Sequence, residues 1–337
     1  MVAQDKSVLR ANIGRIAAAV ACLMLLLGVP FFVRSRFLLH VLIMVLIYGV
    51  LGQAWNILGG YAGQVSLGHA VYFAVGAYTS TVLLTTMGVS PWLGMVAGAA
   101  LAALLSVLVS YPCFRLSGKY YVIASIALLK IMQVALINLN AVGGAAGMLV
   151  PILQESLWNL EFHSSKVPYY YVGLAMLGLA IAACMYVDRS KMGYYFRTIK
   201  ESEIVAESLG IDAVRYKLIA MAMSAVLCSM VGTLYAQYVL YIDPESVVSL
   251  PISIKMCLLV VLGGVGTVWG PVLGAAVLVP LSEMTRALLG GSGKGIDLIL
   301  YGALIVVIIL YQPGGVLKIL KSISLLTGTR RRGVGEK

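Results

Sequence analysis

The chain has 337 residues, of which 61% are apolar and only 11% are charged. A soluble domain carries about 25% charged residues, so this composition excludes an ordinary water-soluble fold. The formal net charge is +11, but the basic residues form short runs at the ends of apolar stretches. We interpret this charge as membrane topology and expect no nucleic-acid partner. The composition therefore predicts an all-α polytopic membrane protein surrounded by membrane lipid.

Ten apolar stretches are long enough to be considered as transmembrane spans. The stretch that follows the first basic residues resembles a signal peptide, but it lacks a small-residue cleavage site, so we expect a retained helix. We expect a cytoplasmic N-terminal tail over residues 1–15, one transmembrane domain over 16–312 and a basic cytoplasmic tail over 313–337. In chain order the expected spans are 16–33, 37–58, 70–86, 92–113, 121–140, 169–187, 216–240, 252–265, 269–289 and 296–311.

The distribution of basic residues predicts which side each loop occupies. With the N-terminus in the cytoplasm, 17 of the 24 Lys and Arg residues lie in inside segments and four lie outside. Cytoplasmic loops carry an excess of Lys and Arg, so we expect both termini inside, which requires an even number of crossings. Ten spans satisfy this requirement.

Two connections are longer than the others. Residues 141–168 are expected outside, as a lid, a partner surface or a plain loop. Residues 188–215 are expected inside and contain FRTIKESEIVAESLGID over 196–212, which predicts a short amphipathic helix that stops at Gly210. Its acidic residues oppose an anionic membrane, so a protein partner is favoured, although a helix lying at the lipid headgroups remains an alternative.

A glycine-rich stretch after the second span is the best candidate for a translocation path. Non-helical backbone and clustered polar side chains are costly at membrane depth unless they line a cavity or pack inside protein. An ordinary cytoplasmic loop is the alternative. The candidate path residues are Gln53, Asn56, Gly60, Gly63, Gln64, Ser66 and His69.

Lys130 is the tenth residue of a twenty-residue span and cannot easily extend its ammonium group to either membrane surface. An insertion cost of about 2.5–3.5 kcal/mol makes us expect that it faces water or another protein segment rather than lipid. We include it in the candidate path, with a structural hydrogen bond as the alternative.

A second glycine series, Gly266, Gly270 and Gly274, recurs at intervals of four and predicts close helix packing. Known catalytic and metal-binding patterns are missing from the sequence. The string GGSGKG at 290–295 fails as a phosphate-binding loop, because Gly295 stands where Ser or Thr would hold magnesium. We therefore expect no catalytic residues, no metal site and no cofactor in this chain.

Four strings resemble the LivM-type permease family of bacterial branched-chain amino acid ABC importers. They are ILGGYAGQVSLGHAVYFAVGAYTS (57–80), FRTIKESEIVAESLGID (196–212), YIDPESVVSLPISI (241–254) and LGGVGTVWGPVLGA (262–275). This resemblance implies an inner-membrane permease bundle of about ten spans that imports leucine, isoleucine and valine. It also implies four kinds of partner interaction: a second homologous permease, two ABC ATPases that bind ATP and Mg²⁺, a periplasmic solute-binding protein and lipid.

The resemblance further implies roles for particular residues. The inside loop would present coupling helices to the ATPases, and residues 60–69 would form a gate or path. Members of this family also import urea, short amides or other amino acids, so these solutes are alternatives to the branched-chain amino acids. An ion-coupled secondary transporter is the alternative of another class, disfavoured because acidic residues are scarce within the spans. The expected coupling residues are Arg197, Lys200, Glu201, Glu203, Glu207, Gly210 and Asp212.

Overall fold

The computed structural model describes residues 24–288 except 34 and 117, together with 302 and 303. Long helices dominate it, because a helix satisfies its own backbone hydrogen bonds inside an apolar medium. The long helices in chain order are α2 (Arg36–Trp55), α3 (Ala70–Met87), α4 (Pro91–Cys113), α5 (Lys119–Asn138), α6 (Val167–Arg189), α9 (Ala213–Val239), α11 (Leu250–Gly263) and α12 (Gly270–Leu288).

Shorter elements join these helices. A π-helical turn, η1 (Asn56–Tyr61), continues α2, and the loop between α6 and α9 holds α7 (Lys191–Glu201) and α8 (Glu203–Ser208). The remaining short elements are η2 (Asn140–Val142), η3 (Gly144–Ala146), β1 (Met148–Leu149), β2 (Tyr241–Ile242) and α10 (Pro244–Val247). The two strands pair antiparallel, with Met148 opposite Ile242.

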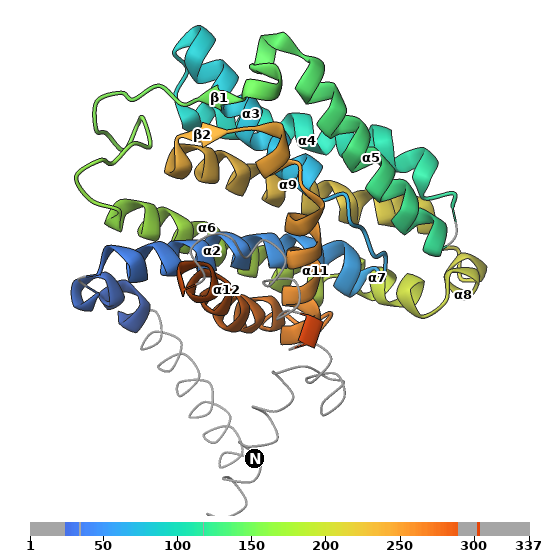
Figure 1. Ribbon diagram of the computed structural model, residues 1–337. Coiled ribbons are helices and arrows are strands. Elements are labelled where there is room, and N and C mark those ends of the chain that lie inside the picture. The colour runs from blue at the N-terminus through green and yellow to red at the C-terminus, as the bar shows by residue number, and fades with distance from the viewer. Residues whose placement is uncertain (1–23, 34, 117, 289–301, 304–337) are drawn as a thin grey trace, which may run out of the picture.

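The helices form two layers (Figure 1). One layer holds α3, α4, α5 and α9, the other holds α2, α6 and α12, and α11 runs between them. Glycines let α3 and α9 approach backbone to backbone. A Cβ added at Gly76 would lie 1.9 Å from the Ser229 carbonyl oxygen, and one added at Gly232 would lie 2.0 Å from that of Phe73. Small residues at helix contacts are typical of membrane proteins, where close packing must replace the hydrophobic effect.

Seven helical segments among the described residues are long and apolar enough to cross a membrane. They correspond to the second to eighth spans predicted from the sequence, and α12 corresponds to the ninth. The eighth span is longer than expected, because α10 and α11 together extend it over Pro244–Gly263. Residues 16–23 of the first predicted span, most of the tenth span and both predicted tails lie outside the described residues.

The two long loops lie at opposite ends of the helices (Figure 1). The segment after β1 lies at one end, and α7 and α8 lie at the other. This arrangement agrees with the opposite sides that the basic residues predict for residues 141–168 and 188–215.

Candidate coupling surface and translocation path

The loop between α6 and α9, which the sequence predicts inside, contains two helices where the sequence predicted one. The expectation of a single amphipathic helix over 196–212 is corrected by a break at Ser202, whose backbone is extended (φ −161°, ψ 118°). The Ser202 hydroxyl accepts a hydrogen bond from the backbone N–H of Val205 and so caps α8. Serine side chains favour this capping geometry over a helix interior. Gly210 follows the end of α8 and has φ +80°, a conformation that glycine adopts without strain.

Four of the predicted coupling residues contact their own chain. The Arg197 guanidinium bonds the Asp188 carboxylate, and the Lys200 ammonium donates to the Gly60 carbonyl oxygen at 3.0 Å. Asp212 caps α9 by accepting from the backbone N–H of Arg215 at 2.9 Å. These contacts fix the loop against the transmembrane helices.

Glu203 makes the fourth contact. Its carboxylate lies 2.6 Å from the ammonium of Lys217 on α9. The Lys217 side chain is 3% exposed, whereas that of Glu203 is 43% exposed. A buried charge is costly without a partner, so this pair anchors α8 to α9.

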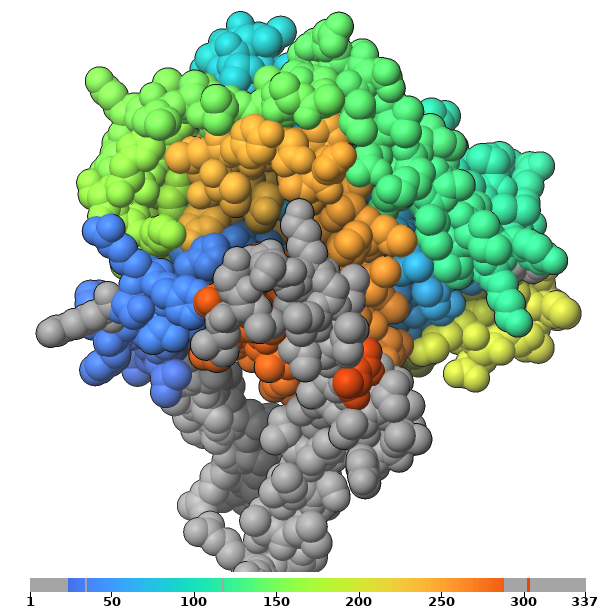
Figure 2. All heavy atoms as spheres, in the orientation of Figure 1, coloured from blue at the N-terminus to red at the C-terminus, as the bar shows by residue number. Residues whose placement is uncertain are grey.

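The outer face of α8 combines apolar and acidic side chains. Ile204 is 78% exposed and Leu209 is 70% exposed, and the neighbouring Val205 is exposed as well. Glu207 of α8 and Glu201, the last residue of α7, are exposed as well. Figure 2 shows this segment, in yellow, at the edge of the molecule. Exposed apolar side chains surrounded by acids are typical of a protein contact.

The glycine-rich stretch is folded inside the protein. Residues 51–62 are all buried, and the Trp55 indole N–H donates to the Ser66 carbonyl oxygen at 2.8 Å. A Cβ added at Gly59 would lie 2.4 Å from the Trp55 ring. Gln64 and Gly63 are half-buried at the next turn. The buried turn is therefore part of the packed bundle.

Polar side chains tie this stretch to distant helices. Gln53 donates to the Val268 carbonyl oxygen at 2.6 Å. The buried His69 ring lies 2.9 Å from the Ser224 hydroxyl, which donates to the Ala54 carbonyl oxygen at 2.6 Å. Buried polar groups in an apolar interior need such partners.

Asn56 connects this stretch to the turn before α12. Its side chain accepts from the backbone N–H of Gly266 at 2.9 Å and donates to the Thr267 carbonyl oxygen at 3.0 Å. The three glycines predicted to allow close helix packing therefore occupy different kinds of position. Gly266 lies in the turn before α12 with φ +72°, Gly270 begins α12, and a Cβ added at Gly274 would lie 1.9 Å from the Leu259 carbonyl oxygen of α11.

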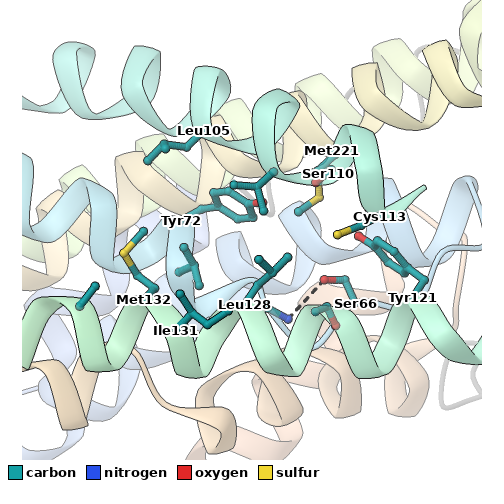
Figure 3. Close-up of a pocket in the computed structure, with 15 residues that line it drawn as sticks. Ser66, Tyr72, Leu105, Ser110, Cys113, Tyr121, Leu128, Ile131, Met132 and Met221 are labelled. Atoms are coloured by element: carbon teal, nitrogen blue, oxygen red, sulfur yellow. Dashed lines mark hydrogen bonds between the residues drawn. The ribbon is translucent and has the colours of Figure 1, made fainter. Parts of the chain in front are cut away.

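A cavity of about 190 Å³ adjoins the glycine-rich stretch. It lies between α4 and α5, with Ser66 and Tyr121 at one end and Leu105 and Met132 at the other (Figure 3). Ser125 of α5 accepts from the backbone N–H of Leu67 at 3.0 Å and so ties α5 to this stretch. The lining is apolar with hydroxyl groups at one end, a combination typical of small-molecule sites.

Lys130 lies outside this cavity. Its ammonium donates to the Gln133 side chain at 2.8 Å, and the residue is exposed on α5. In α5 only Tyr121, Ser125 and Leu129 are buried. The structure therefore brings the candidate path residues of the glycine-rich stretch together, but it places Lys130 apart from them.

The loop between α5 and α6, which the sequence predicts outside, is organised by two carboxylates. Glu155 accepts hydrogen bonds from the backbone N–H groups of His163 and Ser164, which together with the Ser164 hydroxyl lower its pKa. Buried Glu161 accepts from the backbone N–H of Leu153 at 2.6 Å and lies 3.3 Å from the His163 ring. Within the described residues, no group of three His, Cys, Asp or Glu side chains is arranged to hold a metal ion.

Sequence reasoning missed several residues of these sites. Lys217, Ser125 and Ser224 make their contacts over 14, 58 and 155 to 170 positions, so no local spacing identifies them. The cap at Ser202 did have a signal, since a serine directly before an acidic residue marks a helix start.

Residues 37–309 match the family described as branched-chain amino acid transport system, permease component. The chain belongs to this permease family. It is 28% identical over 320 residues to the high-affinity branched-chain amino acid transport system permease protein LivM of Escherichia coli, covering 88% of this chain and 74% of the relative.

Two further relatives bear on the comparison. The permease is 24% identical to LivH of Salmonella typhimurium, covering 80% of this chain and 91% of the relative. It is 27% identical over 212 residues to the nucleoside ABC transporter permease protein NupC of Lactococcus lactis, covering 57% of this chain and 63% of the relative. No solved structure matches. The chain is thus a multi-pass inner-membrane transport component and not an enzyme.

Proposed function

We propose that this permease carries branched-chain amino acids across the inner membrane as one subunit of an ATP-driven importer. The observation that carries the proposal is the family match over residues 37–309. The similarity to both LivM and LivH supports pairing with a second, homologous permease. Two ABC ATPases and a periplasmic solute-binding protein complete the proposed complex, and the ATPases bind the ATP and Mg²⁺.

The outer face of α8 is the part that we assign to the ATPase contact. Ile204, Glu207 and Leu209 are exposed there, whereas Arg197, Lys200, Glu203 and Asp212 hold the loop in place through the contacts described above. We therefore restrict the proposed coupling surface to these exposed residues. Exposed apolar groups supply contact area, and the acidic groups favour a basic partner surface.

The proposed path runs along the glycine-rich stretch and the cavity beside it. Ser66 and Gly68 line that cavity, so movement of the stretch changes its shape. The exposed face of α5 carries Lys130, and a charge at mid-span costs about 2.5–3.5 kcal/mol in lipid. We therefore assign this face to the boundary with the second permease, where water or polar groups of the partner surround the ammonium.

Uptake by the reconstituted complex tests the proposal. The two permeases and two ATPases are reconstituted in vesicles, and radiolabelled leucine is offered with the binding protein outside and ATP accessible to the ATPases. We expect uptake that requires ATP. Uptake of nucleosides instead of leucine would indicate a nucleoside importer, as the name of the NupC relative suggests. Uptake driven by a proton or sodium gradient without ATP would contradict an ATP-driven importer.

A further inference from the structure

Lys200 lies where three distant parts of the chain meet. Its ammonium donates to the carbonyl oxygen of Gly60, 140 positions earlier. Gly60 belongs to the last turn of the continuous helix formed by α2 and η1. The last carbonyl groups of a helix lack helical donors, and a cation near them complements the helix dipole. The Lys200 ammonium thus caps a transmembrane segment from within the cytoplasmic loop.

The aliphatic part of the Lys200 side chain packs closely against Gly63. A Cβ added at Gly63 would lie 2.7 Å from Cγ of Lys200, and Gly63 has φ +73°. A glycine is therefore required where the chain turns beneath this side chain. A Cβ added at Gly266 would lie 3.0 Å from the Gly60 carbonyl oxygen and 3.7 Å from the Lys200 ammonium. The Asn56 side chain joins the same turn through its bond to the Gly266 N–H.

Neighbouring contacts also join α7 to η1 and to the bundle. Phe196 and Ile199 of α7 are buried, and the Arg197 guanidinium lies 5.9 Å from the centre of the Tyr61 ring in η1. A displacement of α7 is therefore transmitted to η1. Three residues beyond Gly63, Ser66 begins the part of the chain that lines the cavity.

We propose that Lys200 is a positioning residue that transmits movement of the cytoplasmic loop to the glycine-rich stretch, and through it to the cavity between α4 and α5. Lys200 acts toward its own chain and not by contacting an ATPase. This inference rests on the proposed function, because movement of the loop is assigned to ATPase partners.

Three measurements on Lys200→Met in the complete complex test this role. Methionine keeps an apolar stem of similar length but cannot donate to Gly60. We expect leucine uptake to fall about tenfold or more, since a charge-assisted hydrogen bond is lost, while ATP hydrolysis stays within about twofold of the unaltered complex. Amide hydrogen exchange over residues 60–69 should become faster. Lys200→Arg should restore much of the uptake.

Lys191→Met is the matched control, because Lys191 is exposed at the first residue of the same helix. It should change neither uptake nor exchange. Unchanged uptake in Lys200→Met would overturn the proposal, and so would loss of the ATPases on purification, which would make Lys200 a docking residue.

Two further arms keep the test decisive. Should Lys200→Met fail to accumulate, Lys200→Gln, whose side chain is too short to reach Gly60, replaces it with the same expectations. Should the unaltered complex show no ATP-dependent uptake, the proposed function fails. The exchange measurement still tests the Lys200 contact in that case, and unchanged exchange over residues 60–69 overturns it.

Discussion

The ion pair between Glu203 and Lys217 gives the sharpest stability prediction. Glu203→Gln removes the carboxylate but keeps the shape of the side chain, and so leaves the buried Lys217 ammonium without its charged partner. Breaking a fully buried pair costs about 3–5 kcal/mol, but Glu203 is 43% exposed, so solvent screening reduces this cost. We expect a loss of about 2 kcal/mol of stability, close to the value of a hydrogen bond between charged groups.

Thermal unfolding of the purified chain in one detergent measures this effect. About 2 kcal/mol corresponds to a decrease in Tm of roughly 3 °C for a chain of 337 residues. Glu207→Gln is the matched control, because Glu207 lies on the same short helix and is exposed, and its Tm should stay within about 1 °C of the unaltered protein.

A second substitution tests the physical cause. Lys217→Met removes the buried charge, so adding Glu203→Gln to it should cost little further stability. The reasoning is refuted if Glu203→Gln and Glu207→Gln have the same Tm, or if the effects of Glu203→Gln and Lys217→Met simply add.

Three other predictions concern separate parts of the molecule. Gly274→Leu should abolish accumulation in the membrane, because an added Cβ meets a backbone oxygen at 1.9 Å, whereas Gly178→Leu, with no atom within 4 Å, should accumulate normally on immunoblots. Ile204→Asp should reduce recovery of the ATPases at least about tenfold in affinity purification while leaving Tm unchanged, since it alters only an exposed apolar contact; full recovery would remove α8 from the coupling surface. The lowered pKa of Glu155 means that its stabilisation of the external loop is present above the ordinary carboxyl pKa and is lost as the pH falls through the lowered value. Proteolysis of that loop should therefore increase at acidic pH, and Glu155→Gln should show the faster cleavage already at neutral pH.

The transmembrane helices were predictable because each is a long apolar run, and hydropathy alone determines where such a run can lie. The seven spans that meet length and hydropathy criteria agree with the predicted second to eighth spans. The basic residues also predict opposite sides for the two long loops, and these loops do lie at opposite ends of the helices; which end faces the cytoplasm stays a prediction. Both features arise from properties of short segments.

The contacts of the candidate site were not predictable from one sequence. Lys200 and Gly60 are 140 positions apart, and Asn56 and Gly266 are 210 apart, so only the folded helices bring them together. The pattern of charged and apolar residues favoured one helix across Ser202. The Ser202 hydroxyl instead caps α8 by accepting from a backbone N–H, and the helix is interrupted there. Four of the charged residues expected to face an ATPase also make contacts within the chain, and these contacts could not be read from the local sequence.

Mass spectrometry of the proteins that co-purify with the tagged chain, extracted from its native membrane in mild detergent, tests the central claim most directly. The account predicts two ATPases with phosphate-binding loops and a second permease of the same family. Recovery of the chain alone, under conditions that preserve a control ABC complex, would contradict the account and point to a transporter that works without ATPase partners.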